Sequence, residues 1–140
     1  MKKGVFTTIV VPNTDQTYAI GVNNSGEIVG EFVRTPSSLT ESFLHRRGVF
    51  SAVALQNSRI TQALGVNDAG QIVGVFIDNN GAPHGFVETR GRFVNVDFPG
   101  SVSTEVHGIN DSGEIVGGWE DTDGGEHGFI GTPVEGVASR

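Results

Sequence analysis

Short runs of alternating apolar and polar residues, separated by turns rich in Asn, Asp and Gly, extend along most of this chain. The pattern of residues 17–32 recurs at 61–76 and again at 104–119, at offsets of 44 and 43 residues. Alternation with a period of two predicts half-buried β-strands. A fixed repeat of this length is typical of a stacked supersecondary unit, such as the four-stranded blade of a β-propeller. We therefore expect an all-β fold of three propeller blades.

Each complete repeat is expected to hold four strands joined by tight turns. The first two strands are predicted at 18–22 and 27–33, and again at 62–66 with 71–77 and at 105–109 with 114–119. Asn or Asp followed by Gly closes each hairpin, because these residues tolerate turn conformations and Gly takes a positive φ. The third strands contain Phe43, Phe86 and Phe129, and the fourth strands follow at 48–55 and 91–98. We expect one repeat domain, 1–140, with blades at 17–55, 61–98 and 104–133.

The N-terminal segment follows the same spacing. Phe6 precedes Thr17 by 11 residues, just as Phe50 precedes Thr61 and Phe93 precedes Thr104. Residues 4–11 are therefore predicted to be a fourth strand, whereas the third repeat stops after its third strand. This circular permutation predicts that residues 4–11 complete the last blade, either of a partner chain or of the same chain.

Three blades in an arc would leave two faces bare. If each face exposes roughly 400 Å² of apolar surface, the cost at about 25 cal/mol/Å² is roughly 10 kcal/mol per face. Two arcs joined head to tail would close a six-bladed ring. We therefore favour a homodimer, with a nine-bladed trimer, a tight three-bladed ring and a fragment of a longer propeller as alternatives.

The composition of the chain argues against several classes of binding partner and structural framework. The formal net charge of −7 argues against nucleic acid and anionic membrane surfaces, both of which attract basic patches. The chain has no Cys, so a disulfide framework is excluded. No apolar run approaches the roughly 18–20 residues that span a bilayer. Residues 1–11 could be mistaken for a signal peptide, but we interpret residues 4–11 as a strand, since Pro12 ends the apolar stretch.

Several motifs resemble the bacterial HAF repeat family. They are Gly-Ile-Asn-Asp-Ser-Gly-Glu-Ile-Val-Gly at 108–117, His-Gly-Phe at 84–86 and 127–129, and Asp-Phe-Pro-Gly at 97–100. These tandem repeats are described as extracellular and are thought to build β-propellers. The resemblance implies that fold and an extracellular location, and it supplies no reaction, cofactor or catalytic residues. The first repeat departs from it, with Glu41-Ser42-Phe43 in place of His-Gly-Phe.

Ligand-binding residues are expected in the loops that join the second strand to the third and one repeat to the next, since function concentrates in loops on a rigid sheet. A small molecule or glycan is the expected ligand. Trp119, which replaces Phe32 and Phe76, is a candidate platform for a sugar ring. The full set of candidates is Asn13, Asp15, Asn57, Arg59, Trp119 and Asp121.

Metal and cofactor chemistry is not expected from the motifs. Asp121 and Asp123 alternate as in a calcium loop, but the later ligand positions of an EF-hand loop do not match. We expect no cofactor, with a divalent cation such as calcium at these two residues as the alternative. His84 and His127 lie on different blades, and we expect each imidazole to bond a backbone group.

Glu105 and His107 form the most distinctive polar pair. His107 stands where the other repeats have Ile20 and Leu64, and Glu105 lies two residues earlier on the same strand. A Glu and a His that converge near the ring axis would serve as base and acid, or hold a metal. A water-lined channel is the simpler interpretation of the same residues.

Three functions follow from these features. The favoured one is an oligomeric propeller that binds or displays a ligand, of the carbohydrate class, over the ring axis. The second is a hydrolase or lactonase-like enzyme with an axial site that depends on a metal. The third is a propeller fragment without a function of its own.

Overall fold

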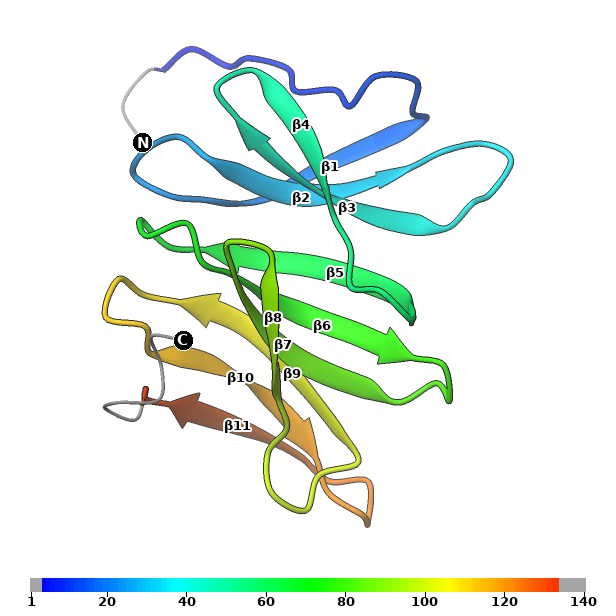
Figure 1. The fold of residues 1–140 in the computed structure, drawn as a ribbon, viewed down its shortest axis with the longest axis vertical. Coiled ribbons are helices and arrows are strands. Elements are labelled where there is room, and N and C mark those ends of the chain that lie inside the picture. Colours follow the sequence, from blue (N-terminus) through cyan, green and yellow to red (C-terminus); the bar gives the residue numbers. More distant parts are fainter. Residues whose placement is uncertain (1–3, 134–140) are drawn as a thin grey trace.

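A computed structural model describes residues 4–133 of the chain (Figure 1). These residues form eleven β-strands in three antiparallel sheets and contain no helix, hence none that is long and apolar enough to cross a bilayer. The expectation of an all-β fold built from repeated strands is confirmed.

Each sheet is a simple meander in which consecutive strands pair. Sheet 1 holds β1 (Gln16–Val22), β2 (Ile28–Val33), β3 (Thr40–Arg46) and β4 (Val49–Val53). Sheet 2 repeats this order with β5 (Ser58–Val66), β6 (Ile72–Asp78), β7 (Pro83–Thr89) and β8 (Arg92–Val96). Sheet 3 holds β9 (Ser103–Ile109), β10 (Ile115–Glu120) and β11 (Glu126–Gly131). The expected lack of a further strand after β11 concerns residues 134–140, which lie outside the described residues.

The segment 4–11 differs from the expectation. It forms no strand, and only its end is anchored, where Val11 is buried with Phe32 and Phe43 of sheet 1. In Figure 1 this dark-blue segment runs beside sheet 1, at the end of the molecule opposite β11. The segment therefore does not pair with the last sheet of its own chain. Pairing with the last sheet of a partner chain stays a prediction.

The same bulge interrupts the first strand of every sheet. The ladder skips Ile20 in β1, Leu64 in β5 and His107 in β9. Opposite each bulge stands a glycine, and a Cβ atom at Gly74 would lie 1.8 Å from the Gln62 carbonyl oxygen. Only a residue without a side chain allows this close approach between the first two strands.

The three sheets stack face to face, and their apolar contacts form the core. β5 packs against sheet 1, and β9 packs against sheet 2 (Figure 1). The buried residues at the first junction include Val29 and Ala63, and those at the second include Val73 and Val106. The described sheets form an open stack that does not close into a ring.

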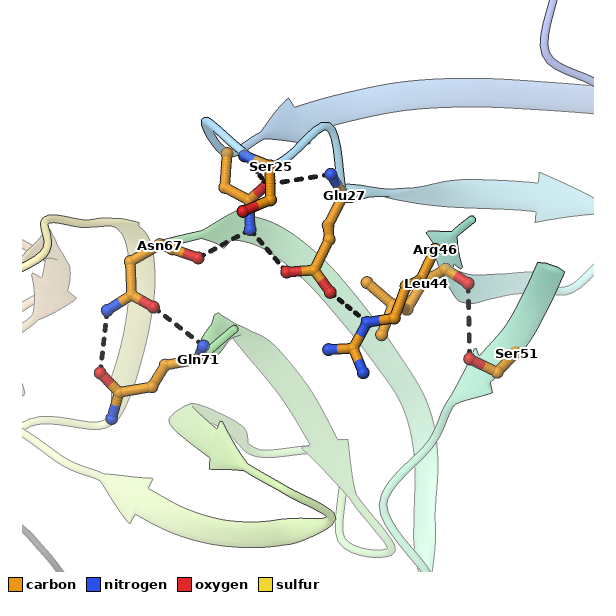
Figure 2. Close-up of polar contacts among 8 residues, drawn as sticks. Ser25, Glu27, Leu44, Arg46, Ser51, Asn67 and Gln71 are labelled. Carbon is orange, nitrogen blue, oxygen red and sulfur yellow. Dashed lines mark hydrogen bonds and ion pairs between the residues drawn. The ribbon is translucent and has the colours of Figure 1, made fainter. Parts of the chain in front are cut away.

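Asparagines in the first turn of each sheet tie neighbouring sheets together. Asn23 Nδ2 donates to the Asn67 carbonyl oxygen at 3.0 Å, and Asn67 Nδ2 donates to the Asn110 carbonyl oxygen at 3.0 Å. Figure 2 shows this corner, with Asn67 bonded to Gln71 of its own turn and Glu27 paired with Arg46. One side chain type thus closes the hairpin and joins the sheets.

Candidate functional site

The loops expected to carry the ligand site lie together at one end of the stack. The connections β2–β3, β6–β7 and β10–β11 are all at the right in Figure 1, away from the asparagine turns. We call this end the loop end. Rigid strands hold each loop there, as is common for binding sites.

A groove of about 320 Å³ opens at the loop end between sheets 1 and 2. Leu39 and Glu41 border it from sheet 1, and Ser58 and Arg59 border it from the start of β5. Ser42 lies at the groove as a buried link between the sheets: its hydroxyl donates to the Thr61 carbonyl oxygen and accepts the Ala63 N–H, both at 2.9 Å. The groove therefore has a rigid base and charged walls.

At the position where sheet 1 has part of the groove, sheet 2 has a histidine held between two carboxylates. We call this cluster of His84, Asp78 and Asp97 the polar clasp. Asp97 accepts a hydrogen bond from His84 Nδ1 at 2.7 Å, and Asp78 contacts His84 Nε2 at 2.8 Å. The imidazole also stacks on Phe76, with 5.0 Å between ring centroids. These residues correct our expectation for His84, because its partners are carboxylates and not backbone groups.

Hydrogen bonding within the polar clasp favours the charged forms of His84 and Asp78. Hydrogen bonding to Asp78, and secondly to Asp97, raises the pKa of His84 against the opposing effect of its burial. The same hydrogen bond from His84, followed by the Ala82 N–H, lowers the pKa of Asp78. The carboxylates of Asp97 and Asp78 contact opposite nitrogens of the His84 ring, so they do not converge on a common position where they could hold a cation.

Sheet 3 carries a simpler form of the clasp. His127 Nε2 lies 2.7 Å from Asp121, and its ring packs against Trp119 with 4.4 Å between centroids. This contact, followed by the N–H groups of Gly125 and Asp123, lowers the pKa of Asp121. His127 is therefore also paired with a carboxylate and not with a backbone group, contrary to expectation.

Sheet 1 lacks the clasp, which is why a groove remains. Glu41 and Ala54 stand at the positions of His84 and Asp97. Arg34 stands at the position of Asp78 and lies over the Phe32 ring, 4.7 Å from its centroid. Without a His–Asp bridge, the space between β3, β4 and β5 stays open.

The structure places the predicted ligand-binding residues in different settings. Of the six, Arg59 borders the groove. Asn13 and Asn57 have φ values of 61° and 64° in equivalent turns, where the third repeat has Gly100, so their side-chain type suits a left-handed turn. Asp15 accepts a hydrogen bond from the Thr35 hydroxyl.

The remaining candidates pack against the chain itself. The Trp119 indole stacks on Phe98, with 4.1 Å between centroids and 8° between planes. Asp121 Oδ1 accepts the N–H groups of Asp123 and Gly125, both at 2.9 Å, which shapes the β10–β11 turn. Among residues 4–133, no group of three or more His, Asp or Glu side chains is arranged to hold a metal ion.

Glu105 and His107 do meet. His107 Nε2 lies 3.0 Å from the Glu105 carboxylate, and both side chains are about half exposed, at 54% and 43%. Sequence reasoning thus found this pair and Arg59. It missed Glu41 as a groove residue and the asparagine contacts between sheets. The signal for the groove was present, since Glu41 breaks the His-Gly-Phe motif.

Comparison of the chain with models of protein families, with curated proteins and with solved structures finds no match.

Proposed function

We propose that this protein is a binding module built from propeller-type blades, with its ligand site in the groove between sheets 1 and 2. The observation that carries the proposal is the replacement of the His84–Asp97 clasp by Glu41 and Ala54, which opens the groove at one junction of the stack. A repeated scaffold that departs from its repeat at a loop-bordered groove is a natural place for a ligand.

The chemistry of the groove suits a small neutral molecule rich in hydroxyl groups, such as a carbohydrate. Glu41 accepts hydrogen bonds, Arg59 donates them, and the Ser58 hydroxyl does both. Neither Glu41 nor Arg59 forms an ion pair within residues 4–133, so both are available to a ligand. Leu39 and Leu55 add apolar surface for the carbon face of a sugar ring. The negative charge of Glu41 and the positive charge of Arg59 cancel, which favours a neutral ligand.

The test is a binding screen by thermal shift and calorimetry over neutral mono- and oligosaccharides. We expect at least one sugar to bind the unaltered protein. The double variant Glu41→His/Ala54→Asp installs a clasp of the sheet 2 type in sheet 1, and it is expected to fold and to lose binding. Asn95→Ala, an exposed change on β8, serves as the matched control and is expected to bind normally. A panel without any binder, or binding that survives the double variant, would refute the proposal.

The contact between Glu105 and His107 supports a second candidate function, a hydrolase that uses this acid–base pair. A panel of lactones and esters, assayed before and after chelation of divalent ions, tests it. Turnover that disappears in both Glu105→Gln and His107→Asn would support the hydrolase. Turnover that persists in both would exclude these residues as its catalytic groups.

The resemblance to the HAF repeats, and the extracellular location that it implies, stay predictions. They are consistent with a binding module, since that family supplies no reaction of its own.

A further inference from the structure

The two outer faces of the stack resemble the two sides of a junction that already occurs twice inside it. Val29 and Val73 are 0% exposed because the next sheet covers them, whereas the equivalent Val116 of sheet 3 is 50% exposed. Ala63 and Val106 are likewise 0% exposed beneath the preceding sheet, whereas the equivalent Ala19 of sheet 1 is exposed. Each outer face therefore presents one half of the apolar junction: sheet 3 presents the half with Val116, and sheet 1 presents the half with Ala19.

In the hydrogen bonds between the asparagine turns, the donor always belongs to the earlier sheet and the acceptor to the next sheet along the chain. Asn23 donates to sheet 2 and Asn67 donates to sheet 3, each through Nδ2. The backbone N–H groups of Asn24 and Asp68 also donate forward, to Asp68 Oδ1 at 2.7 Å and to Asp111 Oδ1 at 2.8 Å. Within residues 4–133, the matching donors of sheet 3, Asn110 Nδ2 and the Asp111 N–H, have no sheet ahead of them.

Sheet 1 offers the acceptors that sheet 3 lacks. The Asn23 carbonyl oxygen and Asn24 Oδ1 stand at the positions that accept from the preceding sheet elsewhere in the stack. No preceding sheet covers them within the described residues. The two ends are thus complementary in hydrogen bonding as well as in apolar surface.

The small residues at the ends also match. A Cβ atom on Gly85 would lie 2.8 Å from Val106 of the next sheet, so the second junction needs a glycine at this position. At the first junction the equivalent residue is Ser42, which lies against the smaller Ala63. The equivalent Gly128 of sheet 3 has only the Gly117 carbonyl oxygen nearby, at 3.8 Å. Gly128 therefore leaves space for the exposed Ala19, the residue equivalent to Val106.

Sheet 3 has no fourth strand among the described residues, and residues 5–9 match such a strand in register and in apolar character. They are equivalent to β4 and β8, in which Phe50 and Phe93 pack 5.3 Å and 5.1 Å from Phe43 and Phe86. Phe6 stands at the equivalent position of the repeat but is 85% exposed, and Val5 is 95% exposed. An exposed apolar segment outside any sheet can pair with the open edge of another sheet. Among the described residues, the outer edge of β11 pairs with no other strand and so is open to such a segment.

We propose that two copies of this chain join head to tail, with residues 5–9 of each copy forming the fourth strand beside β11 of the other. The occupant is a second copy, because Val11 anchors the segment to sheet 1 at the far end of the stack from β11 (Figure 1). Two identical junctions close a ring of six sheets. The inference does not depend on the groove between sheets 1 and 2.

The register follows from β7 and β8. Val87 pairs with Val94 and Thr89 pairs with Arg92 in sheet 2, so Ile130 is expected opposite Thr7, and Thr132 opposite Val5. Residues directly opposite in antiparallel strands have Cβ atoms about 4.5–5.5 Å apart. That spacing is short enough for a disulfide after modest adjustment.

Cross-linking tests the register, because the chain has no native Cys. Thr7→Cys and Ile130→Cys are made in separately tagged chains, refolded together and oxidised. We expect a disulfide-linked heterodimer from this mixture and from Val5→Cys with Thr132→Cys. Thr8→Cys with Ile130→Cys is the matched control and should not link, since residue 8 faces the other side of the strand.

The outcomes separate the alternatives. Cross-links in the two expected pairs, with the control unlinked, support the exchanged strand. A double Thr7→Cys/Ile130→Cys chain that oxidises within a single molecule would show closure on itself and overturn the proposal. Folded variants, verified by circular dichroism, that give no cross-link in either expected pair would also overturn it.

Discussion

The asparagines at 23, 67 and 110 show how one residue type serves two levels of structure. Each accepts a hydrogen bond from a backbone N–H of its own turn, and Asn23 and Asn67 also donate to the next sheet. Asn67 is 3% exposed, so its amide would be costly to leave unpaired. Asn110 makes the same contacts within its turn, without a sheet ahead of it among the described residues.

The pair Asn67→Ala and Asn110→Ala separates folding from association. Asn67→Ala is expected to lower the free energy of unfolding by about 2–3 kcal/mol, since a buried hydrogen-bonding side chain is lost. Asn110→Ala is expected to cost about 1 kcal/mol in its turn and to raise the dimer Kd about 10-fold. Urea denaturation and sedimentation over a dilution series measure the two effects. An Asn110→Ala dimer as tight as the unaltered one would contradict the proposed junction.

His84 makes stability depend on pH in a stated direction. Because its pKa is raised in the folded protein, its contribution is fully present below the unfolded value of about 6.5 and is lost as pH rises through the folded value. The pKa of Asp78 is lowered, so its contribution is present above about 3.9 and is lost as pH falls through the folded value.

We therefore expect the clasp to stabilise the fold most between about pH 4 and pH 6.5. The measurement is the difference in free energy of unfolding between the unaltered protein and His84→Gln across pH. That difference should shrink as pH rises above the upper limit of this range. A difference that stays constant up to pH 9 would show that His84 acts by packing on Phe76 alone.

At the level of elements, the glycines opposite the bulges restrict the sequence more than the strand pattern does. Gly30, Gly74 and Gly117 each place a hypothetical Cβ within 2.0 Å of a carbonyl oxygen on the first strand. A β-bulge brings that carbonyl toward the second strand, so no side chain fits there.

Gly74→Ala is expected to lower the free energy of unfolding by about 3 kcal/mol, because the strands must separate to admit a methyl group. Gly118→Ala is the matched control on β10, where the nearest atom to the new Cβ is the His127 carbonyl oxygen at 3.6 Å. Its effect should stay within about 0.5 kcal/mol. Thermal and urea unfolding of both variants provide the measurement, and equal losses would argue against the steric explanation.

The strands were predictable because alternation, turn residues and the repeat period all indicate the same elements. The strands from β1 to β11 lie where the repeated pattern places them. Residues 4–11 were the exception, since a strand needs a neighbour and the described chain provides none for them. The departure of Glu41 from the His-Gly-Phe motif was visible in the sequence, but its place at a groove depends on how β3, β4 and β5 are arranged in space.

The polar clasps also lay beyond sequence reasoning. Nothing in the spacing of His84 and Asp97 shows that neighbouring strands bring them within 2.7 Å. Glu105 and His107 were predictable as a pair because they share one strand. Contacts within a strand can be inferred from its period, whereas contacts between strands require the register.

For the whole molecule, the stack is the unit that matters. Its internal junctions are apolar and hydrogen-bonded, with a small residue, Ser42 or Gly85, where the next sheet approaches. Its two outer faces carry the separate halves of the same junction. A closed ring of six sheets would satisfy both faces at once and give the exposed residues 5–9 a place in a sheet. That closure is the central claim of this account.

The mass of the intact protein in solution, measured by multi-angle light scattering at micromolar concentration, tests the claim most directly. Two arcs joined head to tail predict twice the 14.7 kDa mass of one chain. A folded species that remains at 14.7 kDa over the whole concentration range would contradict the exchange of strands between copies.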